Sequence, residues 1–214
     1  MIGRRLLQGT GLACLLAAGG LLVMGRPGAR PTPPAGFGEA AEGELPDFGP
    51  APPFKLTDQA GEPFDSASLR GEVWVADFVF TRCVLVCPVL SRVMARLQEA
   101  TVQAGVADGT RLVSLSVDPE HDTPAVLAAY ADRHGADPTR WHFLTGERDE
   151  VWSVVRDGFK LLVSPTPEDA VNPIAHTPRL VLVDRTGSIR GLYDGTVPED
   201  VEALERDLLR LASG

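Results

Sequence analysis

Apolar and polar positions divide most of the chain into short strand-like runs that alternate with longer helical stretches. The run Val73–Phe80 is apolar on both faces except at Asp77, which is typical of a central strand in a covered sheet. After Pro88, apolar residues recur at positions 89, 90, 93, 94 and 97, the spacing of an amphipathic helix, and proline suits the first turn of such a helix. This segment therefore predicts a strand, a short loop and a helix that ends near Gly105.

The same kind of pattern continues on both sides of this segment. A strand, a turn and a short return strand are expected within residues 53–64, and an amphipathic closing helix over residues 201–211. Between them we expect strands at 111–117, 141–144 and 179–184, a hairpin return at 188–193, helices at 123–135 and 147–157, and an irregular segment at 172–178. Strands that alternate with helices, followed by a hairpin and a helix, predict an α/β fold with one central sheet.

The N-terminal part differs in composition from the rest. Arg4 and Arg5 precede the uncharged segment Leu6–Gly25, whose 20 residues are just enough to cross a bilayer. Residues 1–25 are therefore predicted to be a membrane anchor that places the domain in a periplasm-like, extracytoplasmic compartment. A cleaved signal peptide is the alternative, and Gly11–Cys14 faintly resembles a lipoprotein signal. Residues 26–50, rich in proline and glycine, are predicted to be a tether, which leaves 51–214 as the folded domain.

The charge of the chain limits its classes of partner. The formal net charge is −9, and the four arginines and four acidic residues within residues 1–47 cancel, so the whole negative charge belongs to the remainder. An acidic domain repels phosphate backbones, which argues against nucleic acid as a partner. Cations and basic protein surfaces are the favoured partners.

Two cysteines stand at the predicted strand-to-helix turn. The chain has three cysteines, of which Cys14 lies in the N-terminal apolar segment, so the domain holds only Cys83 and Cys87. Thiols near a helix N-terminus meet unpaired N–H groups and the positive end of the helix dipole, which favour the thiolate, and Arg82 adds a nearby positive charge. Such a pair can close a disulfide or clamp one soft metal ion. A purely structural disulfide is the alternative, although so short a loop gains only about 2 kcal/mol.

Four stretches of the sequence resemble one known family. Phe80–Pro88 has the Phe-Thr-x-Cys-x-x-x-Cys-Pro pattern of the Sco/SenC copper chaperones. The stretches Ser116–Pro124 and Trp141–Gly146 also resemble segments of that family, as does His176 ahead of the apolar run 180–184. The resemblance covers about residues 50–212, and it implies a thioredoxin-like fold with a central mixed sheet flanked by helices, behind an N-terminal membrane anchor.

The resemblance also implies a function and a set of ligands. Sco/SenC proteins deliver copper, or reducing equivalents, to the binuclear copper site of cytochrome c oxidase subunit II, and their metal ligands correspond to Cys83, Cys87 and His176. Thiolates select Cu(I), and an added imidazole lets the same site hold Cu(II). The implied partners are subunit II or another copper protein, a copper donor, and the membrane through the N-terminal segment.

Some features of the site depart from the family or are open to two interpretations. The family often carries Pro-Asp inside the cysteine loop, where this chain has Val84–Val86, so the client and the redox tuning stay open. Asp77 can tune the thiols or can be a buried acid satisfied by hydrogen bonds, and the second interpretation is favoured. The remaining histidines, His121, His134 and His142, are interpreted as surface or hydrogen-bonded residues rather than ligands.

Four functions are compatible with these residues. The first is a copper-binding assembly factor without turnover, for which His176 completes a site with both thiolates. The second is a membrane-tethered thiol–disulfide oxidoreductase, in which Cys83 and Cys87 are the catalytic residues and the more exposed Cys83 attacks first. A thiol peroxidase is less favoured because the loop has Thr81 but lacks an upstream proline, and a tethered binding module with an inert disulfide is the fourth. The sequence favours the first and leaves open whether the protein is an enzyme.

Overall fold

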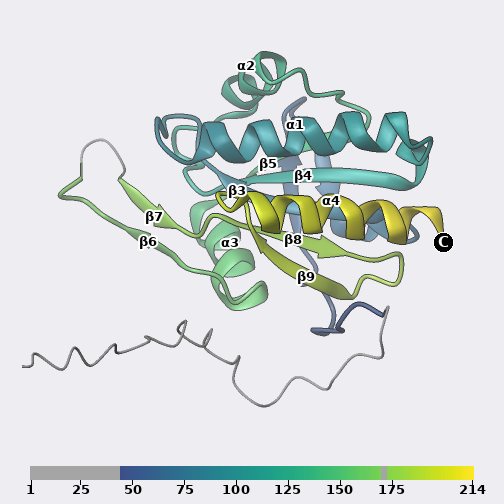
Figure 1. Ribbon diagram of the computed structural model, residues 1–214. Helices are drawn as coiled ribbons and strands as arrows, with labels where there is room; N and C mark the ends of the chain where they lie inside the picture. Colours follow the sequence, from purple (N-terminus) through teal and green to yellow (C-terminus); the bar gives the residue numbers. More distant parts are fainter. Residues whose placement is uncertain (1–43, 170–172) are drawn as a thin grey trace, which may run out of the picture. The chain divides into compact units, whose positions relative to one another are not determined.

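The computed structural model describes residues 44–169 and 173–214 (Figure 1). The expected membrane anchor (1–25) and most of the expected tether (26–50) lie outside these residues. None of the helices in the described part is long and apolar enough to span a membrane.

The described part is a mixture of short strands and helices in an order close to the one expected. The strands are β1 (Lys55–Asp58), β2 (Pro63–Asp65), β3 (Val73–Val79), β4 (Thr110–Ser116), β5 (Trp141–Thr145), β6 (Val163–Pro165), β7 (Ile174–His176), β8 (Arg179–Val183) and β9 (Ile189–Asp194). The α-helices are α1 (Cys87–Gln103), α2 (Pro124–Arg133), α3 (Arg148–Ser153) and α4 (Pro198–Ser213). Three short turns of other helix types complete the elements: η1 (Ser66–Leu69), η2 (Ala107–Gly109) and η3 (Val154–Gly158).

One mixed sheet organises the domain. Its seven strands follow the order β2-β1-β5-β4-β3-β8-β9. The three strands at the centre, β5, β4 and β3, run parallel, whereas the other neighbours pair antiparallel. Every residue of β3 is buried, which explains why its sequence is apolar on both faces. Because β3 and β4 are parallel, their C-terminal ends and the loops that follow them meet at the same edge of the sheet.

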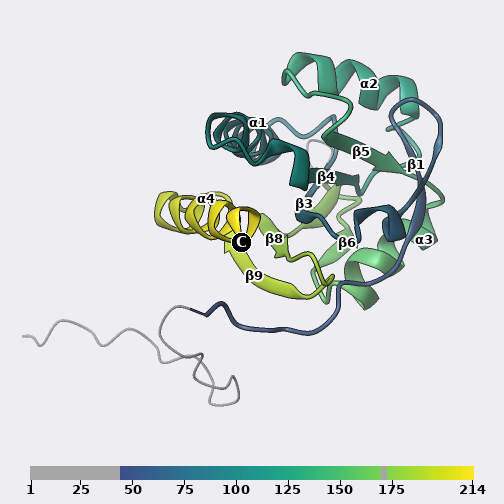
Figure 2. The same cartoon turned by 90° about the vertical axis from the view of Figure 1, so that its right-hand side faces the viewer.

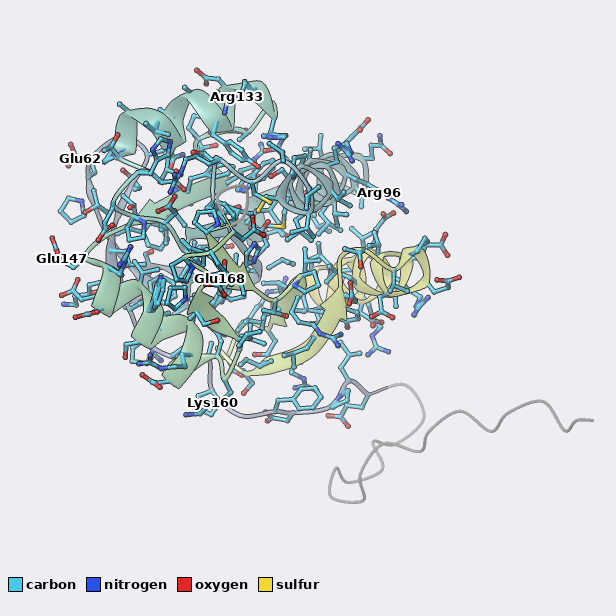
Figure 3. The ribbon with its side chains drawn as sticks, turned by 90° about the vertical axis from the view of Figure 1, so that its left-hand side faces the viewer. Glu62, Arg96, Arg133, Glu147, Lys160 and Glu168 are labelled. Atoms are coloured by element: carbon cyan, nitrogen blue, oxygen red, sulfur yellow. The ribbon has the colours of Figure 1, made fainter. Side chains whose placement is uncertain are left out.

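Helices cover both faces of this sheet. α1 and α4 lie side by side on one face, and α3 lies on the other (Figures 1 and 2). Arg96 of α1, labelled in Figure 3, joins the two helices through an ion pair with Glu205 of α4, in which Nε lies 2.7 Å from Oε2. The inward face of α1 carries Leu90, Met94 and Leu97, all fully buried, as its apolar spacing predicts. The expected α/β sheet flanked by helices is confirmed.

The segment around His176 is more regular than the sequence indicates. Residues 172–178 are expected to be irregular, but Ile174–His176 forms β7, which pairs antiparallel with β6. The two strands make a separate ribbon that projects from the body of the domain (Figure 1). Each strand has only three residues, too few for an alternating pattern to be recognised, and Pro173 and Pro178 flank β7 closely. The expectation of an irregular segment is therefore wrong for these three residues.

Candidate metal centre

The two cysteines stand at the junction of β3 and α1, as the sequence predicts. β3 ends at Val79 and α1 begins at Cys87, with a proline in its first turn. The Cys83 N–H donates to the Phe80 carbonyl at 3.1 Å, which turns the chain back as it leaves the strand. The first helical N–H, that of Cys87, donates to the Cys83 sulfur at 3.4 Å. One thiol therefore occupies the position of an anion at a helix N-terminus.

The β6–β7 ribbon brings a histidine to this pair. His176 is the last residue of β7, and its Nε2 lies 3.5 Å from the Cys87 sulfur. The other ring nitrogen, Nδ1, lies 3.1 Å from the Thr177 carbonyl oxygen. A carbonyl only accepts, so Nδ1 carries a proton and donates, which in the neutral ring leaves the lone pair of Nε2 facing the thiols. The Phe80 ring packs edge-on against the imidazole at 5.6 Å between centroids and limits its rotation.

Together these three side chains form a compact donor set. The ligand atoms of Cys83, Cys87 and His176 all lie within 4.8 Å of one another. Among the described residues this is the one such group of at least three histidine, cysteine or acidic side chains, so no fourth ligand of these types joins it there. Structural zinc sites use four such ligands, whereas two soft sulfurs with one imidazole suit copper in either of its common oxidation states. The three residues predicted from sequence are thus brought together.

The two thiols differ in their protonation. Both cysteines are buried and neither is in a disulfide, with Cys87 fully buried and Cys83 slightly exposed. The Cys87 thiol lowers the pKa of Cys83 by hydrogen bonding to its sulfur, and His176 contributes in the same direction against the opposing effect of burial. The pKa of Cys87 is raised, because its proton is held by Cys83 and because burial disfavours a second thiolate. The pair therefore shares one negative charge, which resides on Cys83.

The positive charge expected next to Cys83 has another partner. Arg82 donates through Nε and Nη2 to Asp118 Oδ2 at 2.9 and 2.6 Å. The groups that lower the pKa of Cys83 are the neighbouring thiol, the imidazole and two backbone N–H groups, and Arg82 is not among them. Arg82 is therefore engaged by Asp118, and the lowered pKa of Cys83 is accounted for by the other groups. Its local sequence position could not reveal a partner 36 residues away.

Asp77 is buried as expected, but only one of its two carboxyl oxygens is hydrogen-bonded. Its carboxyl is fully buried in β3, and Ser114 of β4 donates to Oδ1 at 2.5 Å. Its second oxygen, Oδ2, has no hydrogen-bond partner among the described residues. Burial raises the pKa of Asp77 to about 7, and the nearby His176 opposes this rise electrostatically. Asp77 is thus a half-satisfied buried acid within electrostatic reach of the candidate site.

The other histidines stay outside the site. His142 packs against the Phe64 ring, and burial lowers its pKa. His134 packs against the Tyr130 ring, and burial and Arg133 lower its pKa. His121 lies in the loop between β4 and α2 and is not part of the donor group. None of the three belongs to the donor group among the described residues, but Nδ1 of His142 is buried there without a hydrogen-bond partner, so the interpretation as a surface or hydrogen-bonded residue is wrong for His142.

An exposed apolar rim lies beside the donor set. Inside the cysteine loop, Val84 and Leu85 are 66% and 64% exposed. Leu162, 62% exposed, is bonded through its carbonyl to the Thr177 N–H, immediately after His176. These three residues form the apolar rim, which is accessible to a partner, whereas both cysteines are buried.

Comparison with known proteins agrees with this site. A family model described as SCO1/SenC matches residues 45–213. The SCO1 protein homolog of Bacillus subtilis is 35% identical over 145 residues, which are 67% of this chain and 72% of that protein. Two similar solved structures are those of Bradyrhizobium japonicum ScoI with copper bound and of BsSco. The first is 28% identical with a TM-score of 0.64 and covers 76% of this chain and 99% of that one.

BsSco is a member of the Sco family of cytochrome c oxidase assembly proteins, and a disulfide switch has been identified in it. It is 29% identical with a TM-score of 0.68, and covers 79% of this chain and 97% of that one. The expected thioredoxin-like fold, with a central sheet flanked by helices, is therefore confirmed. With the family model spanning nearly the whole described domain, the chain belongs to the SCO1/SenC family.

Proposed function

We propose that this protein binds copper through Cys83, Cys87 and His176 and serves the assembly of the binuclear copper site of cytochrome c oxidase subunit II. The observation that carries the proposal is the donor set, whose ligand atoms lie within 4.8 Å although the histidine is 89 residues from Cys87. Copper bound to the related ScoI supports the metal, and the family of BsSco supports the process.

The donor set suits a metal that is held and then released. Two sulfurs favour Cu(I), and the imidazole, with Nδ1 tied to the Thr177 carbonyl, offers a nitrogen for Cu(II). A site with three protein ligands leaves a position at which an incoming ligand of a client can begin to bind. The apolar rim around it can be covered by that client, which would exclude water during transfer. Copper is here the cargo, taken from a donor and passed to subunit II or another copper protein.

The site also supports reduction of the client's cysteines, and this is a second candidate function. Cys83 carries the charge of the pair and is the more exposed of the two thiols, as required of an attacking thiolate. Cys87, whose pKa is raised, then serves as the resolving thiol. The disulfide switch described for BsSco supports such cycling. In this role Cys83 and Cys87 are catalytic residues and no copper is required.

The proposed setting is extracytoplasmic. Residues 1–25 would hold the protein in the membrane. The predicted tether would keep the domain near a membrane-bound oxidase in the periplasm, except for its last residues, which pack on the domain through Leu45 and the Phe48 N–H. The acidic domain would engage cations or basic protein surfaces and not nucleic acid.

Transfer to a client tests the proposal and separates its two forms. The copper-loaded protein is mixed with the metal-free, reduced soluble domain of subunit II, and formation of the binuclear centre is followed by its visible absorption. We expect transfer from the wild-type protein and little from a His176→Ala variant. In a second reaction the client domain starts with its cysteines as a disulfide, and the copper-free reduced protein is added. Client reduction that survives His176→Ala but not Cys83→Ser, without copper transfer in the first reaction, would favour the oxidoreductase.

A further inference from the structure

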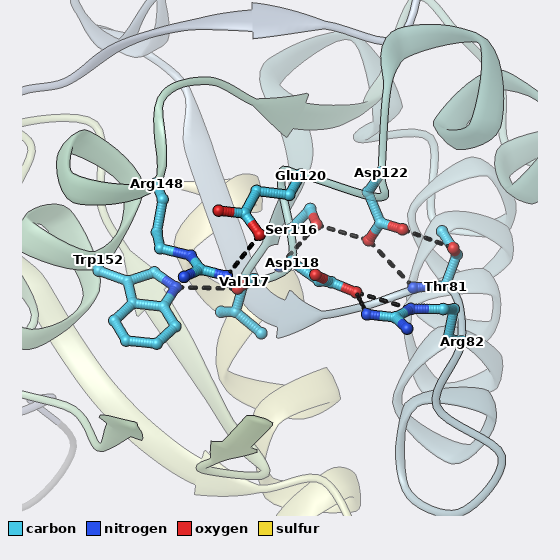
Figure 4. Close-up of polar contacts among 9 residues, drawn as sticks. All are labelled: Thr81, Arg82, Ser116, Val117, Asp118, Glu120, Asp122, Arg148 and Trp152. Atoms are coloured by element: carbon cyan, nitrogen blue, oxygen red, sulfur yellow. Dashed lines mark hydrogen bonds and ion pairs between the residues drawn. The ribbon is translucent and has the colours of Figure 1, made fainter. Parts of the chain in front are cut away.

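The loop that follows β4 binds two consecutive residues at the start of the cysteine loop, Thr81 and Arg82. Because β3 and β4 are parallel, residues 80–82 and residues 117–122 leave the sheet at the same edge. Figure 4 shows two carboxylates of the second loop directed at two consecutive residues of the first. These contacts involve none of the three metal ligands, and they hold the two residues that precede Cys83.

Asp122 is the inner of the two carboxylates. It is fully buried, and it accepts hydrogen bonds from the Thr81 N–H at 3.0 Å and from the Thr81 hydroxyl at 2.5 Å. It also accepts from the Ser116 hydroxyl at 2.6 Å. A buried carboxylate is costly unless such donors compensate it, so both partners are held in place as long as the carboxylate is there. The backbone two residues before Cys83 is thereby anchored to the end of β4.

Asp118 is the outer carboxylate. Its side chain is 3% exposed and forms the ion pair with Arg82, the residue directly before Cys83. The Asp118 backbone N–H donates to the Ser116 hydroxyl at 3.1 Å, and that hydroxyl donates to the Asp122 carboxylate, so Ser116 links the backbone of Asp118 to the side chain of Asp122. Residues 81 and 82 are thus fastened by separate acids that share one supporting hydroxyl (Figure 4).

The contacts with the two acids end at Arg82. Val84 and Leu85 have exposed side chains, and beyond Cys83 the loop is held by the Leu85 and Cys87 N–H groups, which bond to the Cys83 sulfur. On its N-terminal side, the position of Cys83 relative to Cys87 and His176 depends on where residues 81 and 82 are held. Donor sets with tightly supported ligands bind metal more strongly, because supporting groups orient the ligands before the metal arrives.

We propose that Asp122, assisted by Asp118, is a positioning residue that holds Cys83 in the arrangement required for the metal site. This inference rests on the proposed copper function, but it also makes a prediction in the absence of copper. Neither carboxylate is a metal ligand, because neither belongs to the donor group. Asp122 acts on Cys83 through Thr81, and Asp118 acts on it through Arg82.

The chain offers a matched control at the opposite end of the sheet. Asp184 follows β8 and accepts from the Thr186 N–H at 2.9 Å and from the Thr186 hydroxyl at 2.6 Å, the same pair of contacts that Asp122 makes with Thr81. Asp184 is also largely buried and pairs with Arg190 at 3.1 Å. Because β8 runs antiparallel to β3, Asp184 lies near the start of β3 and far from Cys83. An Asp184→Asn variant therefore reports the general effect of losing such a carboxylate.

The test uses the full-length protein in detergent with Cys14→Ser, so that Cys83 and Cys87 are its only thiols. The variants are Asp122→Asn, Thr81→Val, Thr81→Ser and the control Asp184→Asn. Two quantities are measured: the Cu(II) dissociation constant with the sulfur-to-copper absorption band, and the copper-free equilibrium with oxidised dithiothreitol. In that equilibrium the two thiols give up two electrons and two protons to form the Cys83–Cys87 disulfide, and the reagent becomes the dithiol.

We expect Asp122→Asn and Thr81→Val to weaken copper binding about tenfold or more and to shift the absorption band. We expect both also to move the exchange equilibrium about tenfold toward the disulfide, because the support of the reduced arrangement is lost. Thr81→Ser, which keeps the hydroxyl, should match the wild type, and so should Asp184→Asn, even where its unfolding free energy falls.

Each failure has a separate meaning. If Asp122→Asn and Thr81→Val both match Asp184→Asn in copper binding and in the exchange equilibrium, the positioning role is overturned while the proposed function stands. If the wild-type protein binds no copper, the proposed function fails, and the exchange equilibrium alone decides the positioning role. If Asp122→Asn does not fold, Thr81→Val decides, since it leaves Asp122 its bond from Ser116.

Discussion

His176 Nε2 lies 3.5 Å from the Cys87 sulfur, although 89 residues separate the two in the chain. The contact depends on the β6–β7 ribbon, since β7 ends at His176 and pairs with β6 at Val163. The cysteines are placed by the sheet, whereas the histidine is placed by a separate two-stranded element. Two structural elements, the main sheet and the β6–β7 ribbon, therefore meet at the donor set.

The unequal thiols predict unequal reactivity. The pKa of Cys83 is lowered chiefly by the Cys87 thiol, and that of Cys87 is raised, so iodoacetamide should modify Cys83 first. Because the shift of Cys83 is downward, its alkylation should continue as pH falls below the ordinary thiol range. In Cys87→Ala the hydrogen-bond donor is gone, and the midpoint of Cys83 alkylation should move up toward pH 9, the ordinary thiol value. Peptide mapping by mass spectrometry checks this, and Cys87 modified first would contradict it.

Asp77 predicts a pH-dependent stability. Burial raises its pKa from 3.8 to about 7 in the folded protein. An acid with a raised folded pKa contributes stability that is fully present below its unfolded pKa and is lost as pH rises through the folded value. Relative to Asp77→Asn, the unfolding free energy of the wild type should therefore fall between about pH 4 and pH 7, by on the order of 4 kcal/mol. Urea unfolding of the metal-free proteins measures it, and parallel pH curves would show that Asp77 does not titrate in this way.

A substitution in the apolar rim is expected to slow copper transfer to the client without changing copper affinity. Val84 and Leu85 are mostly exposed, so Leu85→Asp should change the unfolding free energy by no more than about 0.5 kcal/mol. Copper affinity should change little, because the side chain is not a ligand. Transfer to the subunit II domain should slow about tenfold, since a charge must then be desolvated at the interface. Val102→Asp, at the far end of α1 and 52% exposed, is the control. Equal transfer rates for the two variants would remove the rim from the client interface.

Local signals in the sequence are sufficient to predict the elements at the centre of the fold. The apolar run of β3 and the helical spacing after Pro88 are both short-range features. They predicted the strand, the helix and the position of both cysteines between them. Periodicity acts over a few residues, and this is the range in which it is informative.

The remaining features of the site depend on contacts between distant residues. β6 and β7 are too short to show periodicity, and only the resemblance to a family joined His176 to the cysteines. Arg82 was assigned to the thiols because it adjoins Cys83, but its partner Asp118 comes from the next crossover. The spacing of Asp118 and Asp122 was visible in the sequence, yet which donors they bind depends on the parallel pairing of β3 and β4.

Copper titration tests the central claim most directly. The reduced full-length protein with Cys14→Ser is titrated with Cu(I) and then with Cu(II), beside Cys83→Ser, Cys87→Ser and His176→Ala, with His142→Ala as a control histidine outside the donor group. We expect one tight equivalent, weakened at least about tenfold in each of the three site variants and unchanged in the control. Binding by the wild type that does not exceed that of the three site variants would contradict a copper site at Cys83, Cys87 and His176.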